Sequence, residues 1–85
     1  MQKKNMEKNM KADKTLDCMG LVDPMPIVSI AKKMKELGSS EVLQVIADDK
    51  GIKQDMPAWC RMTGHEYLGM VETNIEIKFY VRKKR

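Results

Sequence analysis

The chain has 85 residues, a formal net charge of +4, and a hydrophobic content of only 42%. This length allows one small domain, with a single sheet covered by helices on one side, and no stretch is long and apolar enough for a transmembrane helix. The first ten residues lack the apolar segment of a signal peptide, so we expect a cytoplasmic protein.

The positive charge is concentrated at the two ends of the chain. Residues 1–14 carry a net charge of +3 and residues 82–85 carry +4, whereas residues 15–81 carry −3. Charge runs of this kind are usually solvated tails, so they only weakly favour an anionic partner. The two cysteines, Cys18 and Cys60, match neither a disulfide framework nor a zinc-site spacing. We therefore expect reduced thiols, no bound metal and no cofactor.

The first half of the chain predicts an arm, a strand and a helix. Residues 1–11 are polar and without periodicity, which predicts a disordered basic arm before a single domain at 12–85. Residues 12–18 predict a short strand. From residue 24 to 37 apolar side chains recur at helical spacing, and Gly38 is placed to end that helix.

The second half predicts a strand, a helix and two further strands. Residues 41–47 are nearly all apolar and rich in β-branched side chains, which is typical of an interior strand. A helix over 56–63 would have Asp55 as its N-cap, and a third strand would follow over 65–72. A fourth strand is predicted because apolar and polar side chains alternate with a period of two. Tyr80 falls on its solvent-exposed face. Its buried face consists of Ile75, Ile77, Phe79 and Val81.

The element order is therefore βαβαββ. Right-handed crossovers make the first three strands parallel, and the short last connection makes the final pair antiparallel. The predicted fold class is an α/β (α+β) two-layer sandwich, a four-stranded mixed sheet with two helices on one face.

The loop between the first strand and the first helix is the most informative segment. Gly20 allows a turn there, while Pro24 and Pro26 stiffen the chain. Asp23 stands directly before the helix, where its side-chain oxygen is well suited to accept hydrogen bonds from the first-turn N–H groups. The simplest interpretation of Asp23 is a helix cap without chemistry.

Residues 16–26 read Leu-Asp-Cys-Met-Gly-Leu-Val-Asp-Pro-Met-Pro. This run resembles the signature of the TusA/SirA family of small sulfur-carrier proteins, Leu-Asp-x-x-Gly-Leu-x-Cys-Pro-x-Pro. The resemblance implies the same βαβαββ fold, which is like the C-terminal domain of translation initiation factor three. It also implies that Asp23 stands where sulfur-carrying members have the cysteine that holds a persulfide. The resemblance continues through residues 42–49, 55–59, 63–66 and 79–83.

An aspartate at the helix N-terminus takes the electrostatic stabilisation that a thiolate would take, but it cannot bind sulfane sulfur. We therefore interpret the chain as a protein related to sulfur transfer, a partner-binding or regulatory variant and not a stand-alone enzyme. By the resemblance, its partner is a sulfurtransferase or a sulfur acceptor. The predicted docking loop consists of Gly20, Leu21, Pro24, Met25 and Pro26 around Asp23.

Two alternative interpretations stay open. Cys18 lies five positions before Asp23 and is a candidate substitute thiol, although a small core residue is the simpler interpretation. The chain is alternatively an RNA-binding or other nucleic-acid-binding module, which the basic ends favour and the acidic middle disfavours. A polyanion would then contact Lys11, Lys14 and residues 82–85, because an antiparallel fourth strand places them at the edge opposite the loop.

Overall fold

Residues 11–84 are described here from a computed structural model of the chain. The elements are β1 (Lys14–Cys18), α2 (Met25–Met34), β2 (Val42–Ala47), α3 (Ile52–Thr63), β3 (Glu66–Glu72) and β4 (Ile77–Arg82). Their order is the predicted βαβαββ. The predicted disordered arm lies outside the described residues except for Lys11, and so does Arg85.

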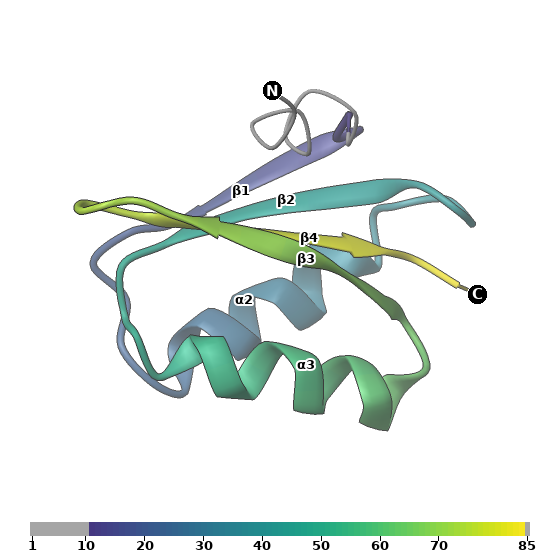
Figure 1. Ribbon diagram of the computed structural model, residues 1–85. Coiled ribbons are helices and arrows are strands. Elements are labelled where there is room, and N and C mark those ends of the chain that lie inside the picture. Colours follow the sequence, from purple (N-terminus) through teal and green to yellow (C-terminus); the bar gives the residue numbers. More distant parts are fainter. Residues whose placement is uncertain (1–10, 85) are drawn as a thin grey trace.

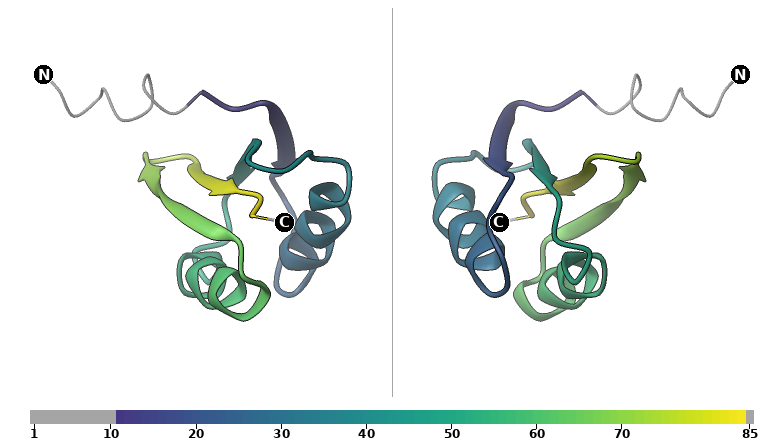
Figure 2. Two further views of the ribbon diagram at one scale, coloured as in Figure 1. Left: turned by 90° about the vertical axis from the view of Figure 1, so that its right-hand side faces the viewer. Right: turned by 90° about the vertical axis from the view of Figure 1, so that its left-hand side faces the viewer.

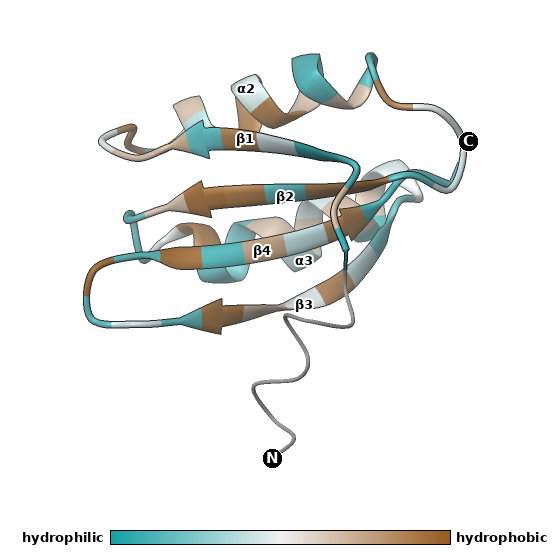
Figure 3. Cartoon of the chain, turned by 90° about the horizontal axis from the view of Figure 1, so that it is seen from above, coloured by the Kyte–Doolittle hydropathy of each residue, from teal (hydrophilic) through white to brown (hydrophobic). Residues whose placement is uncertain are grey.

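The four strands form one mixed sheet in the order β1-β2-β4-β3. β1 and β2 pair in parallel, and β4 pairs antiparallel with both β2 and β3. The first three strands therefore point the same way, as predicted, while the last strand in the chain lies between two earlier ones. Figure 3 shows that the two interior strands are largely apolar, as expected for strands that neighbours cover on both edges.

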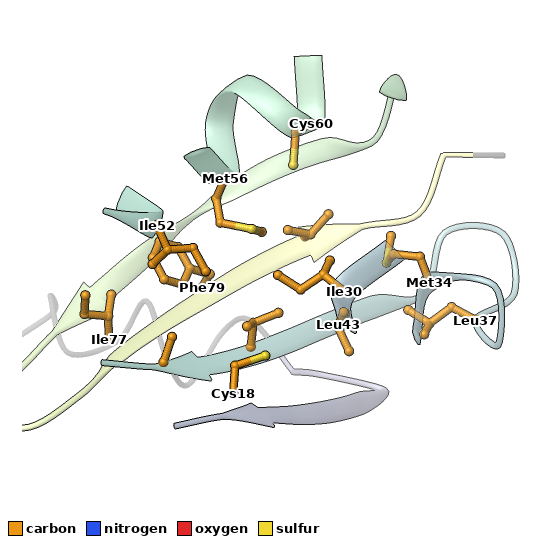
Figure 4. Close-up of a cluster of buried hydrophobic side chains, with 13 residues drawn as sticks. Cys18, Ile30, Met34, Leu37, Leu43, Ile52, Met56, Cys60, Ile77 and Phe79 are labelled. Atoms are coloured by element: carbon orange, nitrogen blue, oxygen red, sulfur yellow. The ribbon is translucent and has the colours of Figure 1, made fainter. Parts of the chain in front are cut away.

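Both helices cover the same face of the sheet, which confirms the predicted two-layer sandwich (Figure 1). Figure 2 shows the two helices side by side beneath the strands. Alternate strand residues and helix residues three or four apart meet between the layers (Figure 4). The most deeply buried side chains include Ile30, Leu43, Val45, Met56, Phe79 and Val81. No helix within residues 11–84 is long and apolar enough to cross a membrane.

The prediction that Asp23 caps α2 is wrong. The helix begins at Met25, its N-cap is Pro24, and no side chain makes a capping hydrogen bond. A cap side chain usually accepts from the N–H of the second or third helical residue. Here the second helical residue is Pro26, which has no N–H, so one of the two donors that Asp23 would serve is missing.

The second helix also begins elsewhere than predicted. α3 starts at Ile52, and its N-cap is Gly51 without a side-chain hydrogen bond, so Asp55 lies in the first turn instead of capping it. The N–H of Gly51 donates to Oδ1 of Asp49 at 3.0 Å, which stabilises this earlier start. Pro57 then falls inside the helix. The helix ends as predicted at Gly64, which has φ 88°.

Two residues of the fourth strand differ from the predicted alternation. Ile75 is 75% exposed because it lies in the β3–β4 turn, where the Thr73 N–H donates to the Glu76 carbonyl. Tyr80, which was predicted to be exposed to solvent, is fully buried. It pairs with Gly69, which has no side chain, and its hydroxyl accepts a 2.9 Å hydrogen bond from Nε2 of Gln44.

The beginning of β1 and the end of β4 lie at the same end of the sheet, as expected. Lys14 and Val81 are register partners of the same β2 residue, Leu43. The Lys83 N–H donates to the Glu41 carbonyl just before β2. The loop that follows β1 lies at the opposite end (Figure 1).

Truncating Ile77 and Ile75 in turn tests the corrected start of β4. Ile77→Ala should lower the free energy of unfolding by about 2–5 kcal/mol, because Ile77 is 2% exposed and its removal leaves a cavity. Ile75→Ala should change it by no more than about 0.5 kcal/mol. Urea denaturation of both variants measures the difference. Equal losses would mean that the strand and its buried face extend back to Ile75.

Candidate functional site

The loop between β1 and α2 leaves the sheet at the carboxyl end of β1, next to the carboxyl end of the parallel strand β2. Gly20 has φ 83° and makes the predicted turn, closed by a hydrogen bond from the Leu21 N–H to the Cys18 carbonyl at 3.1 Å. The Asp23–Pro24 peptide bond is cis. Loops at this edge of an α/β sheet are the usual place for binding.

Carboxylates hold the loop through its backbone. Oδ1 of Asp48 accepts from the Gly20 N–H at 3.0 Å, and Oδ2 of Asp49 accepts from the Asp23 N–H at 2.9 Å. Oδ1 of Asp17 accepts from the Met19 N–H at 2.9 Å. Asp48 and Asp49 follow β2, so the β2–α3 turn positions the β1–α2 loop.

Asp23 is exposed, and its side chain lies against Asp55 on α3. The pKa of Asp55 is raised, first by burial, then by the charge of Asp23, a hydrogen bond with the Asp23 side chain and the charge of Asp49. Carboxylates from the loop, the β2–α3 turn and α3 therefore converge here. Within residues 11–84, no group of three or more acidic, cysteine or histidine side chains is arranged to hold a metal ion.

The nearby lysines are engaged elsewhere. Lys50 and Lys53 lie 3.9 Å and 3.0 Å from carboxylate oxygens of Glu72, and Lys78 lies 3.7 Å from Glu76. Across the described part of the chain, no ion pair joins a cation to any of the five aspartates at this end. These aspartates are Asp17, Asp23, Asp48, Asp49 and Asp55.

The loop and the first turns of α2 also expose apolar side chains. Met19, Val22, Met25 and Val28 are 40%, 66%, 45% and 40% exposed, respectively. Met25 and Val28 are three residues apart and so lie on one face of the helix.

Among the predicted docking residues, Gly20, Pro24 and Met25 are exposed with Asp23, whereas Leu21 packs against the core and Pro26 is buried. Met19 and Val22 belong to the same predicted loop and are exposed as well, so only Val28 was missed as a docking candidate. Val28 could have been found, because it is apolar yet falls outside the buried stripe of the helix.

The two cysteines lie in the core between the sheet and the helices (Figure 4). Cys18 is 0% and Cys60 is 2% exposed. Burial, and then the charge of Asp17, raises the pKa of the Cys18 thiol, while burial raises the pKa of Cys60 to about 11. Both therefore remain protonated at neutral pH, the form that does not act as a nucleophile. Packing in the hydrophobic core, the simpler interpretation, therefore explains both Cys18 and Cys60.

The chain is thus a small two-layer α/β sandwich with an exposed loop, held through its backbone, before its first helix. Residues 14–83 match the family model described as Sulfurtransferase TusA, and the chain belongs to this family. It is 46% identical to YrkI of Bacillus subtilis over 74 residues, which is 87% of this chain and 99% of YrkI.

Two further relatives support the family and the fold. The sulfur carrier protein TusA of Pseudomonas entomophila is 40% identical over 72 residues, covering 85% of this chain and 90% of that protein. A SirA-like protein from Desulfitobacterium hafniense superposes with a TM-score of 0.73 at 24% identity, over 85% of this chain and 99% of that one. This last similarity shows the shared fold.

Replacing Asp23 tests the carboxyl contact. Because the folded protein raises the pKa of Asp55, charged Asp55 destabilises the fold at neutral pH, and that penalty disappears as the pH falls through the raised pKa. Asp23→Asn should lower the Asp55 pKa and make the protein slightly more stable at neutral pH. At acidic pH it should bring no gain in stability. NMR titration of the Asp55 carboxyl and urea melts at two pH values measure both effects. A loss of stability at neutral pH would mean that Asp23 stabilises the loop through its charge.

Truncating Asp49 tests what holds the loop. Asp49→Ala removes the acceptor for the Asp23 and Gly51 N–H groups, and a hydrogen bond to a charged group contributes roughly 1.5–3 kcal/mol. We expect amide hydrogen exchange at Asp23 to become about tenfold faster or more. Asp55→Ala is the matched control, since Asp55 accepts no backbone hydrogen bond from the loop. Unchanged exchange in Asp49→Ala would show that the loop keeps its shape without this carboxylate.

Proposed function

We propose that this TusA-family protein acts in sulfur transfer in the cytoplasm by docking to a protein partner, without carrying sulfur at position 23. The partner is a sulfurtransferase or a sulfur acceptor. The observation that carries the proposal is an exposed, firmly held loop that presents Asp23 where, by the resemblance, sulfur-carrying members have their cysteine.

The chemistry of carriage explains why sulfur is not held there. A thiolate attacks the outer sulfur of a persulfide, forms a new sulfur–sulfur bond and displaces the donor thiolate. A carboxylate has no sulfur atom with which to form that bond. Asp23 does present one negative charge at an exposed position, as a persulfide anion would, and a docking partner can recognise that charge.

The two alternatives have less support. Cys18 is fully buried and its pKa is raised, so it would need local opening of β1 to reach a sulfur donor. Nucleic acid would be repelled from the loop by the five aspartates, which pair with no cation among residues 11–84, and this leaves only the lysine-rich opposite end for such contact. Neither alternative uses the exposed apolar side chains of the loop.

Incubation with glutathione persulfide, followed by intact mass measurement and peptide mapping, tests the proposal. The wild-type protein should gain no sulfur, whereas Asp23→Cys should gain the mass of one sulfur atom at residue 23. Loading should be faster in Asp23→Cys with Asp55→Asn, because removing a nearby carboxylate favours the thiolate. Asp23→Ser is the control that keeps a small polar residue without a thiol.

A second measurement addresses docking. Wild-type protein should slow sulfur transfer from a purified, persulfide-loaded sulfurtransferase to Asp23→Cys, because both compete for the same surface. A sulfur atom on wild-type Cys18 would favour the substitute thiol and contradict the proposal. Asp23→Cys that takes no sulfur would show that the loop no longer supports the family chemistry.

A further inference from the structure

Apolar and acidic side chains occur together at one end of the molecule. We call this end, formed by Met19, Val22, Met25 and Val28 with Asp17, Asp23, Asp48, Asp49 and Asp55, the loop-end surface. The apolar side chains come from one loop and the helix it enters. Asp48 and Asp49 hold that loop, and Asp55 contacts Asp23. The exposed apolar side chains therefore share the loop and its neighbouring segments with the aspartates.

The opposite end of the molecule has the opposite sign. Nine basic and four acidic residues of the described chain lie there, a net charge of +5. The basic residues are Lys11, Lys14, Lys32, Lys33, Lys35, Arg61, Arg82, Lys83 and Lys84, and the acidic residues are Asp13, Glu36, Glu41 and Glu66. The loop end, including Glu72 and Glu76 with three lysines, has a net charge of −4.

The helix dipoles offset only part of this separation. Both α2 and α3 begin at the loop end, and each N-terminus contributes the equivalent of about half a positive charge. Together they amount to about one charge against five aspartates that pair with no cation among residues 11–84. The loop-end surface therefore stays negative, with exposed apolar side chains.

We propose that the partner of the loop-end surface presents an apolar pocket surrounded by lysine and arginine side chains. This inference rests on the proposed function and specifies its partner. Exposed apolar side chains together with charged ones are what protein interfaces combine, and the charge separation turns the loop end toward a cationic surface during approach. A phosphate-rich surface would attract the other end, so nucleic acid and anionic membrane do not fit here.

A pair of synthetic amphipathic helical peptides tests this chemistry, one built from leucine and lysine and the other from leucine and glutamate. We expect only the lysine peptide to shift the amide NMR signals of residues 19–28. Its affinity should fall several-fold when salt rises from about 0.01 M to about 0.15 M, because the screening length shortens from ~30 Å to ~8 Å.

Three variants separate the contributions to binding. Val22→Ser removes the most exposed apolar side chain of the surface and should weaken binding severalfold at both salt concentrations. Asp55→Asn removes one charge without removing a backbone hydrogen-bond acceptor, and it should weaken binding mainly at low salt. Glu36→Gln removes one charge at the opposite end and should leave the affinity unchanged. Glu36 is the matched control because it is exposed and, among residues 11–84, forms an ion pair only with Lys33.

Equal binding of the glutamate peptide would overturn the inference, and so would signal shifts confined to the lysine-rich end. Binding that Val22→Ser does not affect would also overturn it, because simple charge attraction would then explain the result. The competition assay distinguishes this failure from failure of the proposed function. Competition that persists unchanged at high salt contradicts only the inference, whereas no competition under any condition contradicts the proposed function.

Discussion

The site depends on one constraint, the attachment of the β1–α2 loop to the β2–α3 turn by two adjacent carboxylates. Because β1 and β2 are parallel neighbours, their carboxyl ends meet, and Asp48 and Asp49 reach the N–H groups of Gly20 and Asp23. These contacts orient a segment in which Pro26 removes one of the helix N–H groups that a cap would serve. The loop therefore has a defined shape although no side chain caps the helix that follows it.

The same arrangement creates an electrostatic cost. Holding backbone N–H groups with carboxylates brings Asp49 close to Asp23 and Asp55. Burial is the first cause of the raised pKa of Asp55, and the charges of Asp23 and Asp49 raise it further. A protein selected only for stability would have little reason to keep Asp23, which caps nothing. The local packing gives Asp23 no capping role, so the proposed function assigns its carboxylate to contact with a partner. Docking to a cationic partner is the use that fits its exposure and its neighbours.

Sequence patterns predicted the order and approximate positions of the elements, but α2 ends at Met34 and not at Gly38 as predicted. They failed where the outcome depended on contacts between distant segments. The burial of Tyr80 follows from its pairing with Gly69 and its hydrogen bond from Gln44, and neither contact is visible in the local alternation. Similarly, the early start of α3 depends on Asp49, which the sequence indicated only as a turn residue. The loop was found because glycine and prolines mark it, but the residues that hold it lie 26 or 28 positions away.

The family match depends on the whole fold, whereas the proposed absence of sulfur carriage depends on the single residue at position 23. Fold and loop geometry depend on many side chains, so one substitution at an exposed position leaves them intact. Sulfur carriage depends on a single thiol, and the remaining thiols, Cys18 and Cys60, contribute to the core that supports the loop. Under the proposed function, the chain keeps the exposed loop for docking to a partner and has no thiol at position 23 for relay. If docking and carriage are separable in this way, restoring a cysteine at position 23 should add chemistry without requiring any other change in the fold.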